Sequence, residues 1–470
     1  MGKTCSLLVV LTLCVVVVIA FSFTSVEARR SSHMKKTKPQ KHHKHRSPPP
    51  DFESSPSHQT PPLPPYGPFP TQSSIFNVLS FGAKGDGISD DSEAIVAAWK
   101  AACNVPLATV EIPSEYKFLI KPITLQGPCM PHLVLQIDGT LIALPNVGAW
   151  SKSSLYQWIN FKWVHNFTIK GTGTVDGQGS NWWSLSQVQH IKKRSNYIPN
   201  MKPTALRFYA SYDVTVQDIT IINSPLCHLK FDSSNGVKVN NVTISSPENS
   251  PNTDGIHLQN TQNVEIHHSN VGCGDDCVSI QTGCSNIHVH DINCSPGHGI
   301  SLGGLGKDKS IACVKDIVVE HINMQSTLYG VRIKTWQGGQ GSVKNVSFSD
   351  IQVSDVKVPI IIDQYYCDKN HCKNQTGAVA INGVKFDQII GTYSVQPIHL
   401  ACSSGIPCTD VDLINIQLQQ SPGYRGFQQA LCYNSFGKSQ APLVPSSIDY
   451  CLGRSGNAVK RITKSHDNIC

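Results

Sequence analysis

Three polar residues, Asp254, Asp276 and His298, stand at equal steps along the chain, since 276 − 254 = 22 and 298 − 276 = 22. Each is followed by an alternating triplet of the kind found in β-strands: Ile256-His257-Leu258, Val278-Ser279-Ile280 and Ile300-Ser301-Leu302. A period of about 20–30 residues is typical of a solenoid in which every repeat forms one coil. Equivalent residues of successive coils then stack about 4.8 Å apart, because neighbouring strands pair in parallel. The spacing therefore predicts two carboxylates and a histidine in one column, which is a catalytic arrangement.

A fourth coil extends this column and carries two cations. Residues 330–334 align with residues 299–303. Because side chains alternate across a strand, Arg332 and Lys334 are expected on the outer face with the aspartates. The step to this coil is longer, and we expect residues 303–307 to absorb the surplus as a loop. Two fixed cations beside carboxylates suit an anionic substrate; alternatively, they are ordinary solvated residues that neutralise the nearby aspartates.

The middle of the chain, from about residue 166 to residue 355, repeats one strand plan. Apolar residues alternate with polar ones, Val, Ile and Thr are frequent, and Asn often stands before or between the strands. Gly, Asn, Ser and Pro occupy the turns. We predict an all-β chain folded as a right-handed parallel β-helix. A β-sandwich or a propeller is the alternative, but propeller blades repeat at a longer period and pair antiparallel strands.

Helical signals are scarce, and the clearest covers residues 91–102. Its acidic, cap-forming start at Asp91 and its apolar spacing predict one amphipathic helix. Because the terminal repeats of a solenoid need caps, we expect this short helix to close the N-terminal end of the β-helix.

The first 28 residues are typical of a secretory signal peptide. Lys3 precedes an apolar run over residues 7–23, and Val26-Glu27-Ala28 offers a cleavage site. Basic residues follow at Arg29 and Arg30, so an uncleaved single-span anchor is the alternative. No later segment is long and apolar enough to cross a membrane. The sequence therefore predicts export, to the extracellular space or the cell wall, with no membrane segment after cleavage.

Residues 29–74 form a separate basic tail rich in His and Pro, ahead of the domain expected over residues 75–470. Charge and proline leave too little apolar surface to offset chain entropy, so we expect disorder. Residues 29–70 hold eight Lys or Arg against Asp51 and Glu53, which is +6 of the total net charge of +7. In an exported protein such a tail suits an anionic wall polymer better than nucleic acid. Its histidines either bind metal or are simply solvated, and we expect the second.

Seventeen cysteines indicate an oxidising compartment. Cys5 and Cys14 leave with the signal peptide, so 17 − 2 = 15 remain, and at least one is left free or pairs between molecules. The plausible local bridges are Cys277/Cys294, Cys367/Cys372 and Cys402/Cys408. A zinc site is the competing use, but no paired Cys-x-x-Cys pattern is present. Glycosylation acceptors stand at Asn166, Asn241, Asn345 and Asn374.

Four motifs resemble, in order, those of the plant polygalacturonases, glycoside hydrolases of family 28 that cut pectin. They are Asn252-Thr253-Asp254-Gly255, Gly274-Asp275-Asp276-Cys277, Gly297-His298-Gly299 and Arg332-Ile333-Lys334. The similarity extends to residues 81–87 and 176–179 and so covers nearly everything from Ile75 onward. The resemblance implies a right-handed parallel β-helix that hydrolyses α-1,4-galacturonosyl linkages with inversion. It also implies polygalacturonate as the partner, a monomer, and a mechanism that needs no metal and no organic cofactor.

Hydrolysis with inversion needs a carboxylic acid to protonate the leaving oxygen and a carboxylate to activate water. The resemblance implies that Asp275 is the acid, that Asp254 and Asp276 hold and activate the water, and that His298 helps to hold the proton. Three aspartates this close cannot all ionise cheaply, because like charges raise at least one pKa. The resemblance also implies four substrate contacts, of which the two cations pair with the galacturonate carboxylate: Arg332, Lys334, Asn252 and Tyr366.

Two cysteines depart from the family pattern. Cys273 precedes Gly274, where a small or hydroxyl residue is expected, and a free or wrongly bridged thiol there could alter the site. Cys227 stands where an aromatic residue is usual. The alternatives are another pectin-directed β-helix enzyme, such as a rhamnogalacturonan hydrolase or a calcium-dependent lyase, and an inactive protein that binds the wall. Endo and exo attack are not distinguishable from the sequence, because loop shapes decide between them.

Overall fold

The computed structural model describes residues 74–150, 157–189, 202–368, 372, 374–375, 377–424, 426–454 and 469–470. The chain divides into two units, Met1–Gly67 and Pro68–Cys470, and all the described residues belong to the second. The predicted signal peptide and nearly all of the predicted basic tail lie outside the described residues. Within the described part of the chain, no helix has the length and apolar character that a membrane crossing requires.

The strands of the second unit stack in three faces, and every strand pair is parallel. The first face contains, in order, β1 (Ile75–Asn77), β3 (Thr109–Ile112), β6 (Leu133–Ile137), β9 (His165–Lys170), β12 (Tyr212–Gln217), β15 (Asn235–Asn240), β18 (Gln262–Gly272), β20 (Ser285–Cys294), β22 (Ile311–Gln325), β24 (Gln340–Val356), β26 (Ala380–Tyr393), β28 (Cys408–Gln420) and β30 (Ser435–Val444).

The second face is separate only in the early coils. It contains β2 (Asp86–Asp90), β4 (Lys117–Ile120), β7 (Thr140–Ala143), β10 (Thr174–Asp176), β13 (Thr220–Ile222) and β16 (Thr243–Ser245). β18 pairs with both β15 and β16, so from this strand onward one long bent strand serves both faces.

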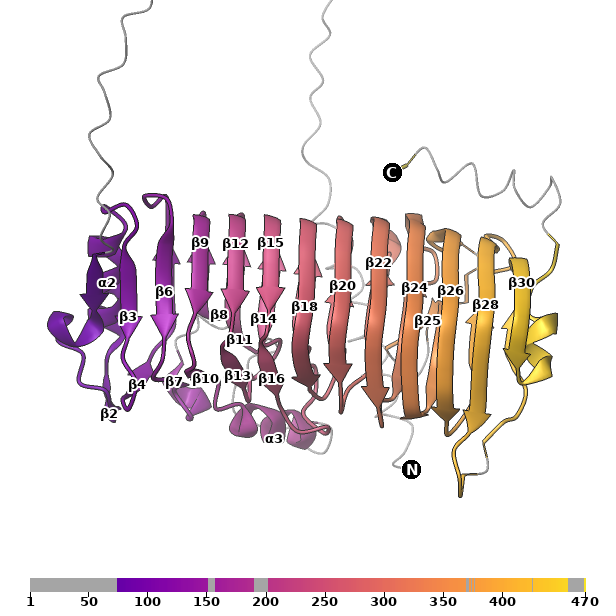
Figure 1. Cartoon of the computed structure of the whole chain (residues 1–470), viewed down its shortest axis with the longest axis horizontal. Coiled ribbons are helices and arrows are strands. Elements are labelled where there is room, and N and C mark those ends of the chain that lie inside the picture. The colour runs from indigo at the N-terminus through magenta and orange to yellow at the C-terminus, as the bar shows by residue number, and fades with distance from the viewer. Residues whose placement is uncertain are drawn as a thin grey trace, which may run out of the picture. The chain divides into compact units, whose positions relative to one another are not determined.

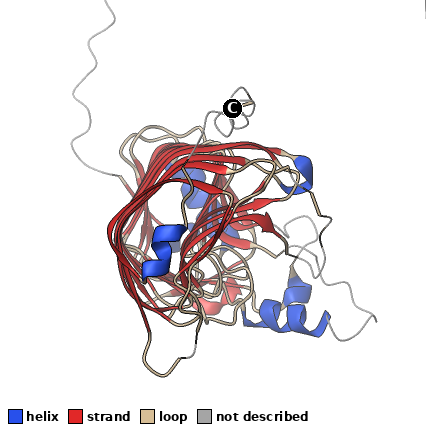
Figure 2. Ribbon diagram, turned by 90° about the vertical axis from the view of Figure 1, so that its right-hand side faces the viewer, coloured by secondary structure: helices blue, strands red, loops and turns tan. Residues whose placement is uncertain are grey.

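The third face contains β5 (Ile123–Gln126), β8 (Gln157–Lys162), β11 (Thr204–Tyr209), β14 (Leu229–Asp232), β17 (Ile256–Gln259), β19 (Val278–Ile280), β21 (Ile300–Leu305), β23 (Tyr329–Trp336), β25 (Val358–Tyr366), β27 (Ile398–Ala401) and β29 (Leu431–Tyr433). The strands lie side by side along the stack (Figure 1), and a view along the stack shows them surrounding one core (Figure 2). The predicted right-handed parallel β-helix is confirmed.

The predicted register of the central coils is also confirmed. Ile256 pairs with Val278, Val278 with Ile300, and Ile300 with Val331, and all four side chains are buried. Other inward positions form ladders of identical residues. Phe161, Phe208 and Phe231 stack with ring centroids 4.7 Å and 4.9 Å apart. Such rows bury large apolar surfaces, which is the main source of stability in a coil with few helices.

Left-handed residues turn the chain between the first and second faces. At this bend the successive coils place Asp218, Asn241, His268, Asp291 and His321, with φ of 64°, 51°, 50°, 54° and 54°. Asp and Asn tolerate this conformation better than most residues do. Asn241 Nδ2 also donates to Asp218 Oδ1 at 2.8 Å, which links two coils. These requirements explain part of the Asn that recurs between strands in the sequence.

The predicted amphipathic helix is α2 (Ser92–Ala102), which contacts β1. It lies at the N-terminal end of the stack (Figure 1). Its Trp99 is buried against Phe161, with ring centroids 5.9 Å apart. Asp91 occupies the N-cap position as predicted, but its side chain makes no capping bond. Its carboxylate instead accepts from Lys84 N at 2.7 Å and Gly85 N at 3.1 Å, where two amides of the preceding turn need an acceptor.

The remaining helices are short or lie outside the coils. Within the described ranges they are α3 (Ser180–Gln189) and the 3-10 turns η1 (Val78–Phe81), η2 (Val147–Ala149), η4 (Lys307–Lys309) and η5 (Ser446–Tyr450).

The loop predicted over residues 303–307 is only partly correct. β21 continues to Leu305, because Gly303 pairs with Lys334 and Leu305 with Thr335. The surplus residues of the long coil instead form η4 and the first residues of β22, ahead of Lys315, which pairs with Ser285.

All three predicted disulfides are present. Three more, between partners 26, 157 and 19 residues apart, are Cys103–Cys129, Cys313–Cys470 and Cys432–Cys451. Their pairing depends on which segments lie side by side, so the sequence does not reveal it. Among the described residues, three cysteines are free, and each is buried: Cys227, Cys273 and Cys284.

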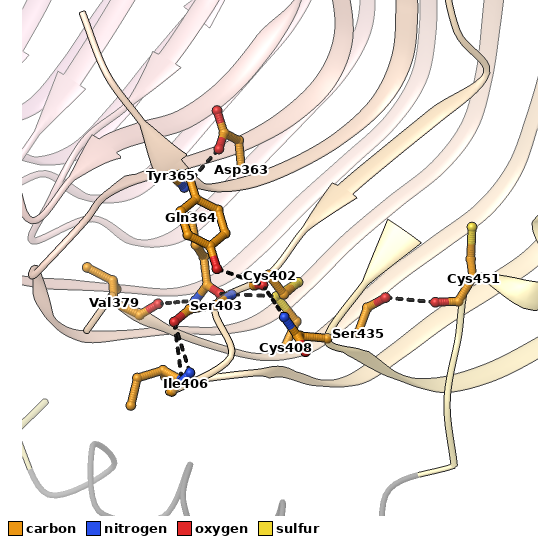
Figure 3. Close-up of a disulfide and its surroundings, with 12 residues drawn as sticks. Asp363, Gln364, Tyr365, Val379, Cys402, Ser403, Ile406, Cys408, Ser435 and Cys451 are labelled. Carbon is orange, nitrogen blue, oxygen red and sulfur yellow. Dashed lines mark hydrogen bonds between the residues drawn. A yellow bond between two sulfur atoms is a disulfide. The ribbon is translucent and has the colours of Figure 1, made fainter. Parts of the chain in front are cut away.

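The Cys402–Cys408 bridge lies in a hydrogen-bonded network beside β25 (Figure 3). Gln364 is completely buried, and its Nε2 donates to Val379 O at 2.8 Å. Its Oε1 accepts from Ser403 N at 2.7 Å, next to the bridge. These contacts fix the segment between β27 and β28 against the third face.

Candidate active site

The third face brings the predicted column together at the N-terminal ends of β17, β19, β21 and β23. Gly255 N donates to Asp276 O at 2.9 Å, and Cys277 N donates to Gly299 O at 2.8 Å. Asp254, Asp276 and His298 directly precede Gly255, Cys277 and Gly299. They therefore lie on three successive coils. The parallel register that stacks the core also aligns the polar residues at the strand ends.

Asp275 is the most exposed of the three carboxylates, at 18% for its side chain. Its Oδ1 accepts from the Asp276 amide at 2.9 Å and lies 3.1 Å from His298 Nδ1. Asn252 Nδ2 donates to its Oδ2 at 3.2 Å. Two predicted site residues, His298 and Asn252, thus flank one accessible carboxyl group.

Asp276 is buried, with only 2% of its side chain exposed. Arg332 Nη2 donates to Oδ1 at 2.6 Å, and Lys334 Nζ donates to Oδ2 at 2.8 Å. Burial by itself raises the pKa of Asp276, but the charges of Arg332 and Lys334 outweigh it and bring the pKa to about 2. This carboxylate is therefore ionised at any ordinary pH.

Asp254 lies in the opposite electrostatic setting. Burial raises the pKa of Asp254 above its ordinary value, the His257 hydrogen bond opposes this, and the charge of Asp275 adds to the rise. The hydrogen bond joins His257 Nδ1 and Asp254 Oδ2 at 2.8 Å. The cluster thus contains one carboxyl group that ionises easily and another that holds its proton more tightly.

Arg332 and Lys334 lie on the outer face of β23 as predicted, but each is at most 7% exposed. The sequence left two roles open for these cations, binding of an anionic substrate and neutralisation of the nearby aspartates. The structure shows the second, because both cations form ion pairs with Asp276. Each cation also lies over an aromatic ring: Arg332 is 4.2 Å from the Tyr329 ring centroid, and Lys334 is 5.5 Å from that of Tyr366. The two rings keep the cations next to the carboxylate cluster.

Tyr366 lies at the edge of this cluster. Its ring meets that of Trp336 at 5.3 Å in an edge-to-face contact, and Lys307 Nζ lies 4.6 Å over the Trp336 ring. Tyr366 and Asp275 are therefore linked through Lys334 and Asp276. Asp254 joins this group through its electrostatic interactions with Asp275 and Asp276. All eight predicted site residues thus lie in one region.

Three residues of this site were not predicted as site residues: His257, Ser301 and Tyr329. Ser301 Oγ donates to Asp276 Oδ1 at 2.8 Å and accepts from Arg332 Nε at 3.0 Å. Tyr329 immediately precedes Gly330, as His298 precedes Gly299, so the coil alignment contained a signal for it. His257 and Ser301 are the polar middle residues of two of the alternating triplets, but their partners depend on side-chain geometry.

Cys273 is free and completely buried, so no wrong bridge forms beside Asp275. Its Sγ lies 3.2 Å from Asp275 O and 3.6 Å from Asp276 O, as a donor to both carbonyl groups. Burial raises the pKa of Cys273 and of Cys227 well above the ordinary thiol range. Both thiols are therefore neutral and act as small packing groups.

A metal ion would meet competition at the carboxylates. One ligand atom each of Asp275, Asp276 and His298 lie within 4.8 Å of one another. Both oxygens of Asp276, however, already bind a cationic side chain. The arrangement favours acid–base chemistry by the aspartates themselves.

A family model described as glycosyl hydrolases family 28 matches residues 103–435. The chain is 39% identical over 379 residues to a probable polygalacturonase of Arabidopsis thaliana, covering 80% of this chain and 84% of that protein. It is 40% identical over 351 residues to a polygalacturonase of Chamaecyparis obtusa, covering 74% of this chain and 68% of that protein.

Solved structures are similar in fold. A polygalacturonase of Erwinia carotovora matches with a TM-score of 0.63 and 22% identity, over 80% of this chain and 99% of that one. An endo-xylogalacturonan hydrolase of Aspergillus tubingensis matches with a TM-score of 0.66 and 22% identity, over 82% of this chain and 100% of that one. At this identity the likeness establishes the fold alone.

Proposed function

Because the chain belongs to the glycosyl hydrolases of family 28, it is a glycoside hydrolase, and we propose that it is a polygalacturonase. Its substrate is homogalacturonan, the α-1,4-linked galacturonate polymer of pectin, and its product has inverted configuration. The observation that carries the proposal is the set of three aspartates in unlike surroundings: one ionised between two cations, one with a raised pKa, and one accessible.

Asp275 is the general acid in this proposal. It is the most exposed carboxyl of the three, and His298 and Asn252 bind its two oxygens. It gives its proton to the glycosidic oxygen as the bond to the anomeric carbon breaks.

Asp254 and Asp276 hold the attacking water on the opposite side of the sugar. Asp254 takes the proton of this water, because a carboxylate with a pKa near 2, such as Asp276, is a poor proton acceptor. His257 orients Asp254 through the bond to its Oδ2.

Arg332 and Lys334 bind the carboxylate of the galacturonate next to the scissile bond. Both cations share the single charge of Asp276, so the pair keeps an excess of positive charge for an anionic ligand. Asn252 and Tyr366 contact the sugars on either side. We expect a secreted, monomeric enzyme of the plant cell wall. The substrate, the signal-like N-terminus and the many disulfides support secretion to this place. The basic tail then binds the anionic polymer.

The proposal is tested by the release of reducing ends from de-esterified polygalacturonate at mildly acidic pH, with chelator present. We expect new reducing ends without the ultraviolet absorbance of unsaturated products, and no effect of the chelator. Unsaturated products would indicate a lyase, and a folded protein that binds the polymer without cleaving it would be an inactive wall protein.

Asp275→Asn tests the assignment of the acid. We expect at least about a 10³-fold loss of kcat, because protonation of the leaving group is lost, with the fold and polymer binding retained. Asp412→Asn, at a surface ion pair with Lys438 on the first face, is the matched control and should keep full activity. Turnover by the Asp275→Asn variant at the rate of that control would overturn the mechanism.

A further inference from the structure

Histidines and carboxylates gather a second time on the first face, away from the strands that carry the catalytic column. Glu265 on β18 pairs in register with His288 on β20, and His267 pairs with His290. One ligand atom each of Glu265, His288 and His290 lie within 4.8 Å of one another. These three residues are called the Glu-His-His cluster, and β18, β20 and β22 lie side by side in Figure 1.

The cluster contains a buried nitrogen that lacks a partner. Within the described part of the chain, His290 Nε2 is shielded from solvent and makes no hydrogen bond. Its nearest opposite charge is Glu265 Oε1 at 3.7 Å, which is too long for a hydrogen bond. Two ligands of a tetrahedral ion with bonds of about 2.1 Å lie about 3.4 Å apart, so this gap has the width that such an ion requires.

The other ring nitrogens are already oriented by carboxylates. His288 Nε2 lies 2.8 Å from Glu320 Oε1, and His290 Nδ1 lies 2.7 Å from Asp291 Oδ2. Metal-binding histidines usually donate their second N–H to a carboxylate in this way, which fixes the tautomer and the ring. The ring nitrogens whose lone pairs remain available to a metal ion are then Nδ1 of His288 and Nε2 of His290.

We propose that the Glu-His-His cluster binds a divalent transition-metal ion of the Zn²⁺ type. Two imidazoles and one carboxylate suit Zn²⁺, Ni²⁺ or Cu²⁺, whereas Ca²⁺ and Mg²⁺ prefer oxygen ligands alone. A groove of about 500 Å³ reaches Glu265 and His288 from solvent, so an ion and its remaining water ligands have access. The ion joins neighbouring coils through β18 and β20.

The surroundings of the cluster do not oppose a cation. Glu320 and Asp291 lie against its histidines. Lys238 lies 3.7 Å from Glu265, and 66% of its side chain is exposed. The ring of His267 stacks on that of His290 with centroids 5.0 Å apart.

The test uses the full chain with all five tail histidines changed to Gln, so that no histidine of the tail contributes: His33, His42, His43, His45 and His58. Zn²⁺ binding is measured by calorimetry, and Co²⁺ serves as a spectroscopic probe of the coordination. We expect one ion per chain. His290→Gln and Glu265→Gln should each weaken Zn²⁺ binding by at least about tenfold. Loss of a residue that is only hydrogen-bonded to a metal ligand already lowers the affinity by about tenfold to a hundredfold.

Two controls separate this site from others on the same chain. His132→Gln changes an exposed histidine far from the cluster and should bind Zn²⁺ as the parent does. Asp275→Asn, in the catalytic carboxylates, should also leave Zn²⁺ binding unchanged. Because an ion that binds only the folded state stabilises it, Zn²⁺ should raise the Tm of the parent and of both controls, but not of His290→Gln or Glu265→Gln.

Activity on polygalacturonate shows that each cluster variant is folded, because the cluster lies outside the catalytic column. The exposed Glu265 gives a second variant in case His290→Gln does not fold. The proposal is overturned if the parent binds no Zn²⁺, if both cluster variants bind it like the parent, or if Asp275→Asn abolishes the binding.

Discussion

At the scale of single residues, Asp276 shows how burial and charge compete. Placing a carboxylate in the interior costs free energy, and here two cations and the Ser301 hydroxyl compensate for that cost. The cations are equally buried, so each member of the group depends on the others. The sequence shows these residue types on one face, but the pairing depends on side-chain geometry.

Replacing Asp276 with Asn should destabilise the fold by about 3–5 kcal/mol, because Arg332 and Lys334 would lose their buried counter-ion. Chemical denaturation at pH 7 measures the change. Asp412→Asn, in a partly exposed pair, should cost less than about 1 kcal/mol. Equal effects of the two substitutions would contradict the ion-pair interpretation.

The same carboxylate should influence stability in acid. Its pKa is lowered in the folded state, so its contribution is complete above the unfolded value of 3.8 and is lost as the pH falls towards about 2. We therefore expect the slope of unfolding free energy against pH between about 4 and 2 to be smaller in Asp276→Asn than in the parent. The lost contribution amounts to about 2 kcal/mol.

At the scale of elements, the coil depends on left-handed residues at its bends. Asn286 has a φ of 55°, and its Nδ2 donates to Asn263 Oδ1. This amide ladder between coils requires a short side chain that tolerates positive φ. The strand interiors follow from alternation alone, whereas each bend depends on such local chemistry.

We expect Asn286→Ala to destabilise the fold more than Asn286→Gly does, by about 1 kcal/mol. Both substitutions remove the hydrogen bond, but only Ala keeps the steric penalty of the left-handed conformation. Thermal or guanidinium unfolding of the two variants measures the difference. Equal stability would show that the bend relaxes to another conformation.

The helix α2 illustrates the limit of local rules. Its existence and apolar spacing followed from the sequence, and it forms as predicted. Asp91, an ideal capping residue by type, instead holds the turn at Lys84 and Gly85. Side-chain acceptors go to the donors that tertiary structure brings near, and a single sequence does not show which donors these are.

At the scale of the whole molecule, charge is divided unevenly along the chain. Residues 29–70 carry +6 of the total of +7, so the remainder is close to neutral. The positive charge of the tail should therefore provide the main long-range attraction for an anionic polymer. Arg332 and Lys334 act on this polymer only at short range.

A full chain with the eight Lys and Arg of residues 29–70 changed to Gln should bind polygalacturonate more weakly at low salt. Its affinity should also depend less on salt, because exposed charges are screened over about 10 Å at 0.1 M. Turnover of short galacturonate oligomers should be unchanged. Polymer affinity that is unaffected at low salt would exclude the tail as a binding element.

The sequence by itself determined the repeat, its parallel strands and the column of Asp254, Asp276 and His298, because a period of 22 residues and alternating side chains are local properties. It also indicated the outward direction of Arg332 and Lys334. Only the tertiary structure decided what these residues do to one another. Ion pairs, shifted pKa values and the Glu-His-His cluster depend on distances of a few ångströms between side chains of different coils, which sequence spacing does not specify.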